Sequence, residues 1–153
     1  MKKILFFLFL AAGLVSPLHS IESPSMQLAV IIHKDNALEK LSITEARLYW
    51  MRRGVQKNWA TLKVMVLPVD RKGACAEKAL FYKQVIKLTE AQTDSYFAAK
   101  QYQSAENPPI KLNSDREVIQ YIADNKAGIG YVNLASLKDE DKNLVKVVCV
   151  VSE

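Results

Sequence analysis

The chain has 153 residues, with 21 Lys and Arg against 16 Asp and Glu, and a formal net charge of +5. The basic residues are scattered, with no long basic run and no aromatic–basic motif, so the composition is not that of a nucleic-acid-binding protein. Two cysteines and two histidines stand in no metal-ligand spacing, and no metal or other cofactor is expected.

The first twenty residues have the pattern of a secretory signal peptide. A basic start, Met1-Lys2-Lys3, precedes the apolar run 4–15 and a short polar segment that ends at Ser20. The apolar run is too short for a membrane-spanning helix, which needs about 20 residues. We therefore expect cleavage after Ser20 and a single exported domain over 21–153. Without the two signal-peptide lysines, 19 Lys and Arg face 16 Asp and Glu, a net charge near +3.

Apolar strands and capped helices alternate along the rest of the chain. Three capping boxes, Ser42 to Glu45, Thr89 to Gln92 and Ser114 to Glu117, predict helix starts. In chain order, the expected elements are a strand over 27–33, a helix from 42 to a C-cap at Gly54, a strand over 64–69, a helix from 74, a helix over 89–103, a helix from 114 that closes at 126–128, a strand over 129–132 and a strand over 145–151. This order predicts an α/β fold: one three-layer domain with a mostly parallel or mixed sheet flanked by helices.

The stretch 63–88 organises the chain as strand, tight loop and helix. A helix that opens directly after a strand directs unpaired backbone N–H groups at whatever lies above the strand. With Arg71 beside it, this is the geometry of an anion site, although most such loops hold only water. In open α/β sheets the ligand crevice lies beyond the carboxyl ends of the strands, where 71–76 falls.

Catalytic arrangements find little support. Ser42 and Ser114 are N-caps by position, and His33 is the sole histidine outside the signal peptide, with no nucleophile elbow in the sequence. Cys75 at a helix start could be reactive, but no spacing links it to His33. We therefore expect a binding domain and not an enzyme.

The two cysteines, Cys75 and Cys149, leave two alternatives open. In an oxidising compartment they could form a disulfide, which would stabilise the fold by about 4 kcal/mol in the chain-entropy model. Otherwise both are free, Cys75 at a helix start and Cys149 in a buried strand. The sequence does not decide between these alternatives.

The order of motifs resembles the second domain of the phosphate-binding proteins of phosphate ABC importers (PstS-like, type 2 periplasmic binding fold), and in particular short one-domain relatives of them. The resemblance covers 26–151. Its segments are LAVIIHKDN, LSITEARLYWMRRG, the Trp59 of KNW, VMVLPVDR with the helix through Phe81, SDREVIQYI, and AGIGYV, which is like the family's GAIGYV.

The resemblance implies a phosphate clasped between two domains, held here by an Arg and a loop with hydroxyl donors. Counting back from Phe81, Arg71 falls on the family's Arg, and Ala74, Cys75 and Ala76 on its Gly, Ser and Gly. Glu77 falls on its Thr. The Arg is therefore kept, but both hydroxyl donors are replaced and the other lobe is missing. The ligand-binding residues that the resemblance implies are Arg71, Ala74, Cys75 and Ala76.

Two functions follow as expectations. The first is an exported solute-binding-like protein that binds phosphate or another small oxyanion weakly at the Arg71 loop, in phosphate uptake with an ABC transporter, a porin or another envelope protein. The second is an envelope protein-interaction module that kept the fold and lost the ligand. A homodimer would supply the missing lobe if two copies faced their Arg71 loops across a two-fold axis.

Overall fold

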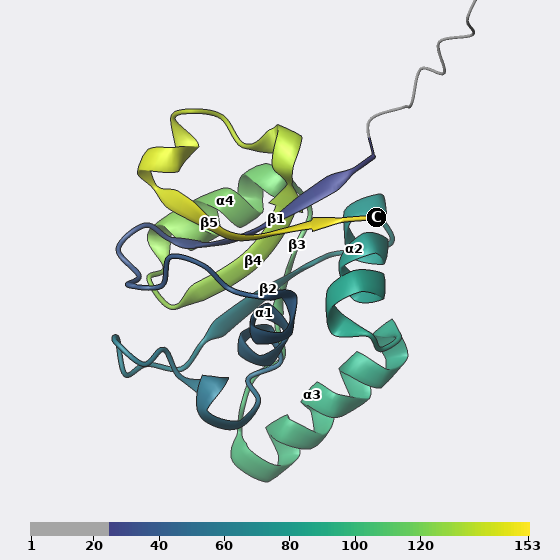
Figure 1. The fold of residues 1–153 in the computed structure, drawn as a ribbon. Helices are drawn as coiled ribbons and strands as arrows, with labels where there is room; N and C mark the ends of the chain where they lie inside the picture. The colour runs from purple at the N-terminus through teal and green to yellow at the C-terminus, as the bar shows by residue number, and fades with distance from the viewer. Residues whose placement is uncertain (1–24) are drawn as a thin grey trace, which may run out of the picture.

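Residues 25–153, the part of the chain that the computed structural model describes, form five strands and four α-helices (Figure 1). In chain order they are β1 (Gln27–His33), α1 (Ile43–Trp50), β2 (Leu67–Arg71), α2 (Ala76–Phe81), α3 (Glu90–Ser104), β3 (Ile110–Leu112), α4 (Asp115–Asp124), β4 (Gly128–Asn133) and β5 (Val145–Ser152). Short 3-10 turns lie at Gly54–Lys57, Leu134–Ser136 and Asp141–Asn143, and a π-helical turn, Tyr82–Ile86, continues α2. The predicted signal peptide, residues 1–20, lies outside the described residues.

The strands form one mixed sheet in the order β3-β2-β4-β1-β5. β2 is parallel to β3 and β4, whereas β1 is antiparallel to both β4 and β5. β2, β3 and β4 therefore finish at the same end of the sheet, here called its carboxyl end, and begin at the opposite, amino end. The predicted α/β fold with a mixed sheet flanked by helices is confirmed.

Helices cover both faces of the sheet, which gives three layers. Because side chains alternate along a strand, Leu28 and Val30 of β1 pack on one side and Ala29 and Ile31 on the other. The larger cluster lies under α1, α2 and α3 and includes Trp50, Trp59, Phe81, Phe97 and Tyr131. The smaller one lies under α4 and includes Val69, Val118, Ile119, Ile122 and Val132. No helix of residues 25–153 is both long and apolar enough to cross a membrane.

The two glycines of the AGIGYV segment allow α4 to approach β4 closely. A Cβ on Gly128 would lie 2.6 Å from Cδ1 of Ile122, and a Cβ on Gly130 would lie 2.8 Å from Cγ1 of Val118. Both distances are too short for carbon atoms in contact, so a larger residue at either position would force Ile122 or Val118 of α4 to shift. The two glycines of AGIGYV are therefore explained by the packing of α4 on β4.

The strand predicted over 64–69 lies further along the chain than expected. β2 runs from Leu67 to Arg71, because the chain first turns back on itself: Lys63 has a φ of 52° and Met65 forms an isolated bridge with Asn58. Val64 is exposed. The apolar run thus combines a turn with a strand, and the helix expected from position 74 begins at Ala76.

The first helix ends earlier than the glycine signal indicated. Its C-cap is Met51, and Arg52, with a φ of 51°, takes the left-handed conformation that ends the helix. Gly54 is also left-handed, with a φ of 58°, but it lies two residues further along the chain. The N–H groups of Arg52 and Arg53 bond back to carbonyls of the last helical turn, as in a Schellman motif. An arginine in this conformation is uncommon, and its side chain is buried.

Two features near β3 also differ from the sequence expectation. β3 itself, Ile110–Leu112, was not predicted, because three residues after two prolines carry no strand pattern. Ser114 caps α4 as expected, with its hydroxyl accepting from the N–H of Glu117 at 3.2 Å. The Glu117 carboxylate, however, accepts from the N–H of Asn113 at 2.8 Å, one residue before the predicted partner.

Candidate functional site

Arg71, the last residue of β2, lies at the carboxyl end of the sheet and is 8% exposed. Its guanidinium forms an ion pair with Asp115, the first residue of α4, and donates at 3.1 Å to the carbonyl oxygen of Asn113. Within the described residues, its Nε is buried and has no hydrogen-bond partner. The predicted anion-binding Arg is therefore held rigidly, but by groups that the sequence reasoning did not include.

Asp115 uses both of its carboxylate oxygens inside the protein. One pairs with Arg71, and the other accepts from the backbone N–H of Asn133 at 3.2 Å and from the hydroxyl of Ser136 at 2.6 Å. These bonds tie the end of β2 to the start of α4 and to the turn after β4. The negative charge of Asp115 also compensates the positive charge of Arg71. An oxyanion at Arg71 is therefore attracted less strongly than it would be at an unpaired guanidinium.

A hollow of about 460 Å³ opens beside this pair. Its walls are formed by Arg71, Ser114, Asp115, Arg116, Ala135, Ser136 and Lys138.

Each cation of this hollow has a carboxylate partner. Besides the Arg71–Asp115 pair, Arg116 pairs with Asp141 at 2.6 Å and Lys138 lies 3.8 Å from Glu140. Burial acts to raise the pKa of Asp141, but the bonds from Arg116 and from the Lys138 N–H outweigh it and hold that pKa below its ordinary value. The Lys138 pair is exposed on both sides and therefore weak, so Lys138 can turn toward an anion.

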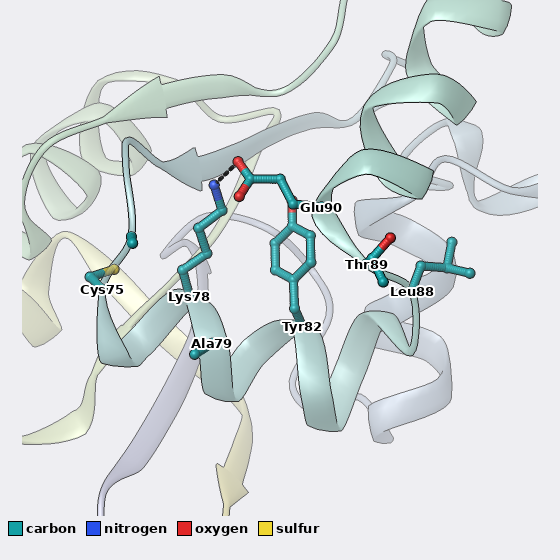
Figure 2. Close-up of a pocket in the computed structure, with 8 residues that line it drawn as sticks. Cys75, Lys78, Ala79, Tyr82, Leu88, Thr89 and Glu90 are labelled. Atoms are coloured by element: carbon teal, nitrogen blue, oxygen red, sulfur yellow. Dashed lines mark hydrogen bonds and ion pairs between the residues drawn. The ribbon is translucent and has the colours of Figure 1, made fainter.

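The predicted loop residues lie on a different pocket. Ala74 and Cys75 line a hollow of about 220 Å³ between α2 and the start of α3, with Lys78, Tyr82 and Glu90 on its other walls (Figure 2). Ala76, the first residue of α2, is exposed and lines neither hollow. The structure thus separates the four residues that the resemblance grouped. Arg71 lines one hollow, Ala74 and Cys75 line the other, and Ala76 lines neither.

Lys78 is the charged group of this second pocket, and it is already satisfied. Figure 2 shows its ammonium bonded to Glu90, and it also lies 3.9 Å from Asp70 and over the ring of Tyr82. Two carboxylates therefore balance one buried ammonium. The pocket offers no uncompensated positive charge to an anion.

Both cysteines are free thiols in the structure. Cys75 is half-buried at the N-cap of α2 and makes no side-chain capping bond, whereas Cys149 is buried in β5. Burial raises the pKa of both thiols, so neither is activated as a nucleophile at neutral pH. The disulfide between Cys75 and Cys149 stays a prediction.

A buried polar network beneath Arg71 was missed by the sequence reasoning. Asp70 is 1% exposed and accepts hydrogen bonds from the hydroxyls of Tyr131 at 2.6 Å and Tyr82 at 2.9 Å, and from the N–H of Arg71 at 2.8 Å. Burial, with the Asp70 charge next, raises the pKa of both tyrosines. The network fixes the end of β2 and with it the direction of Arg71. An Asp directly before Arg71, at the end of a buried strand, was the available signal.

Among residues 25–153 no group of three or more His, Cys, Asp or Glu side chains is placed to hold a metal ion. The arrangement offers a fixed guanidinium, the hydroxyl of Ser114 and one mobile lysine around an open hollow. Such groups can bind and orient an anion. None of them is placed as a nucleophile with a base.

In its fold, the domain matches one lobe of a periplasmic binding protein. No protein-family model matches the sequence, and no curated protein matches it. Several solved structures match the fold of this chain. An ABC-type phosphate transport receptor from Vibrio cholerae matches with a TM-score of 0.56 and 17% identity over 81% of this chain and 46% of its own.

Two further matches are of the same kind. PstS from Borrelia burgdorferi matches with a TM-score of 0.56 and 17% identity over 80% of this chain and 46% of its own. A phosphate-bound protein from Clostridium perfringens, assigned as a phosphate ABC transporter substrate-binding protein, matches with a TM-score of 0.56 and 16% identity over 80% and 44%. This chain thus spans less than half the length of each. At these identities the likeness shows the fold alone.

Proposed function

We propose that this chain is an exported, solute-binding-like protein of the periplasm that binds phosphate or another small oxyanion weakly through Arg71. The observation that carries the proposal is the buried guanidinium of Arg71, oriented by Asp115 and Asn113 at the carboxyl end of the sheet. A preoriented arginine binds oxyanions with little loss of side-chain entropy. The signal-peptide pattern of residues 1–20 supports export.

The same geometry explains why the affinity is proposed to be weak. Asp115 compensates the charge of Arg71, the loop over 74–76 carries no hydroxyl, and the Ser136 hydroxyl already donates to Asp115. This leaves the hydroxyl of Ser114 in the wall of the hollow as a donor for an oxyanion. The hollow beside Arg71 is open to water, and water weakens each charge interaction. We therefore expect a dissociation constant in the millimolar range, worth about 4 kcal/mol.

A second function is favoured by the same ion pair. If Arg71 is satisfied internally for structural reasons, the domain is an envelope protein-interaction module that kept the fold and lost the ligand. An ABC transporter, a porin, another envelope protein or a second copy of the chain would then be its partner. An enzyme is not proposed.

Calorimetric titration with phosphate, sulfate and a neutral solute separates the two functions. The variant is Arg71→Ala, the matched control is Lys142→Ala on an exposed turn, and thermal unfolding verifies that both are folded. Millimolar binding of phosphate or sulfate that is lost in Arg71→Ala and kept in Lys142→Ala would support the first function. No heat at tens of millimolar would leave the interaction module, and sedimentation at high protein concentration would then test the homodimer.

A further inference from the structure

A second concentration of charge lies at the amino end of the sheet, opposite Arg71. Glu106, which follows α3, is 3% exposed and pairs with Lys57 at 2.6 Å and with Lys100 at 3.3 Å. The Nε of the buried Arg52 lies 3.8 Å from the same carboxylate. Arg53 completes the group, because its guanidinium and the Lys100 ammonium both lie over the ring of Tyr96. We call these four cations and Glu106 the Glu106 cluster.

The Glu106 cluster carries an excess of three positive charges. Glu106 is the only carboxylate of residues 25–153 that forms an ion pair with any of its four cations. Carbonyl groups take up part of the charge: Arg52 donates to the carbonyl oxygen of Asn107, and Lys100 donates to that of Arg52 at 3.2 Å. These bonds orient the cations but cancel none of their charge.

The cluster is built into the fold and is not a group of flexible surface lysines. Arg52 is held in a left-handed conformation at the end of α1 and packs over the ring of Phe97 on α3. Arg52 also contacts the sulfur of Met65 at 3.4 Å. The turn Gly54–Lys57 and the end of α3 therefore lie together at the bottom of Figure 1. A fixed arrangement of cations loses little entropy when it meets a partner.

Exposed apolar side chains border the cations. Val55 is 86% exposed, two residues before Lys57, and Met65 is 37% exposed beside Arg52. Arginine and methionine are enriched in protein interfaces over the rest of the surface, although lysine is depleted there. Polybasic membrane-binding patches are clusters of four to eight Lys or Arg beside a membrane span or on an amphipathic helix. Here Arg52 is buried and Glu106 pairs with three of the four cations.

We propose that the Glu106 cluster, with Val55 and Met65, is a docking surface for an acidic segment of another protein. The uncompensated positive charge identifies the occupant by complementarity. A second copy of this chain is disfavoured, because a two-fold interface would set the same excess charge against itself. The proposal does not depend on oxyanion binding at Arg71, which lies at the other end of β2.

The test uses a short fluorescein-labelled peptide of glutamate and leucine, titrated into the purified protein at low and at high salt. A peptide of glutamine and leucine serves as the neutral probe. We expect saturable binding of the acidic peptide alone, weakened by salt, with amide NMR shifts centred on 52–57 and 100–106. Replacing both Arg53 and Lys57 by glutamine should weaken it about five-fold, since each charge pair contributes modestly.

The matched control replaces Lys142 and Lys146 by glutamine, which removes the same charge from two lysines that pair with Asp139 and Glu39. It should change the affinity less than two-fold, and thermal unfolding confirms that both variants are folded. Equal weakening in the two variants, or shifts spread over the whole surface, would overturn the proposal. So would binding of phosphatidylglycerol vesicles without binding of the peptide, which would assign the surface to a membrane.

Discussion

Glu106 permits a prediction whose size follows from the structure. Burial acts to raise the pKa of Glu106, but hydrogen bonds from Lys57, Ser104 and Lys100 outweigh it and lower that pKa from 4.5 to about 2. A shift of about 2.5 units at about 1.36 kcal/mol per unit gives about 3 kcal/mol of stability at neutral pH. The folded-state pKa is the lower one, so this contribution is complete above the unfolded value of 4.5 and is lost as the pH falls toward 2.

The perturbation is Glu106→Gln, which keeps the shape and removes the charge. We expect the variant to be less stable than the original protein by about 3 kcal/mol at pH 7. The difference should shrink steadily as the pH falls from 4.5 toward 2. The control, Glu140→Gln, removes an exposed carboxylate with a weak surface partner and should change stability by less than about 0.5 kcal/mol.

The assay is urea unfolding at a series of pH values from 7 to about 2, followed by circular dichroism. A difference between original protein and variant that is the same at every pH would refute the reasoning. It would mean that Glu106 stabilises the fold by packing and not as a charge. A loss of stability under about 0.5 kcal/mol in Glu106→Gln at pH 7 would also refute it, because removing an exposed carboxylate has an effect of that size.

Two further predictions concern packing and thiol chemistry. Gly130→Ala should destabilise the fold by about 1–3 kcal/mol in urea, because the added methyl meets Val118 at 2.8 Å. The double variant Gly130→Ala with Val118→Ala should lose less stability than the sum of the losses of the two single variants. A loss equal to that sum would show that the contact between residues 130 and 118 is not the cause. In the folded protein, a thiol reagent should label Cys75 slowly and Cys149 only after unfolding, with faster labelling of Cys75 at alkaline pH because its pKa is raised. Two thiols that stay unreactive even after unfolding without reductant would instead demonstrate the disulfide.

Local sequence signals predicted most of the fold. Helix starts at Ser42, Thr89 and Ser114 were correct because capping depends on residues three apart. The strand over 27–33 was correct because a continuous apolar run of that length fits a strand buried on both faces. β3 was missed because its single parallel pairing with β2 comes from the tertiary structure and not from its own residues.

The site was only partly predictable for the same reason. Arg71 stands at a strand end, which a local pattern identifies. Its partner Asp115 is 44 residues away, and the Tyr131 hydroxyl that fixes Asp70 is 61 residues away. Spacing along the chain does not reveal which of the acidic residues meets Arg71. The Glu106 cluster has the same origin, since its members come from the segment after α1, the turn Gly54–Lys57, α3 and the loop after α3.

Amide NMR during a phosphate titration tests the central claim most directly. If Arg71 holds a small oxyanion, millimolar phosphate should shift the amide signals of 71–72, 114–116 and 135–138 along one saturating curve. Arg71→Ala should abolish these shifts while it leaves the rest of the spectrum folded. Shifts that are absent, that do not saturate, or that persist in Arg71→Ala would contradict oxyanion binding at this residue and leave the interaction module as the function to pursue.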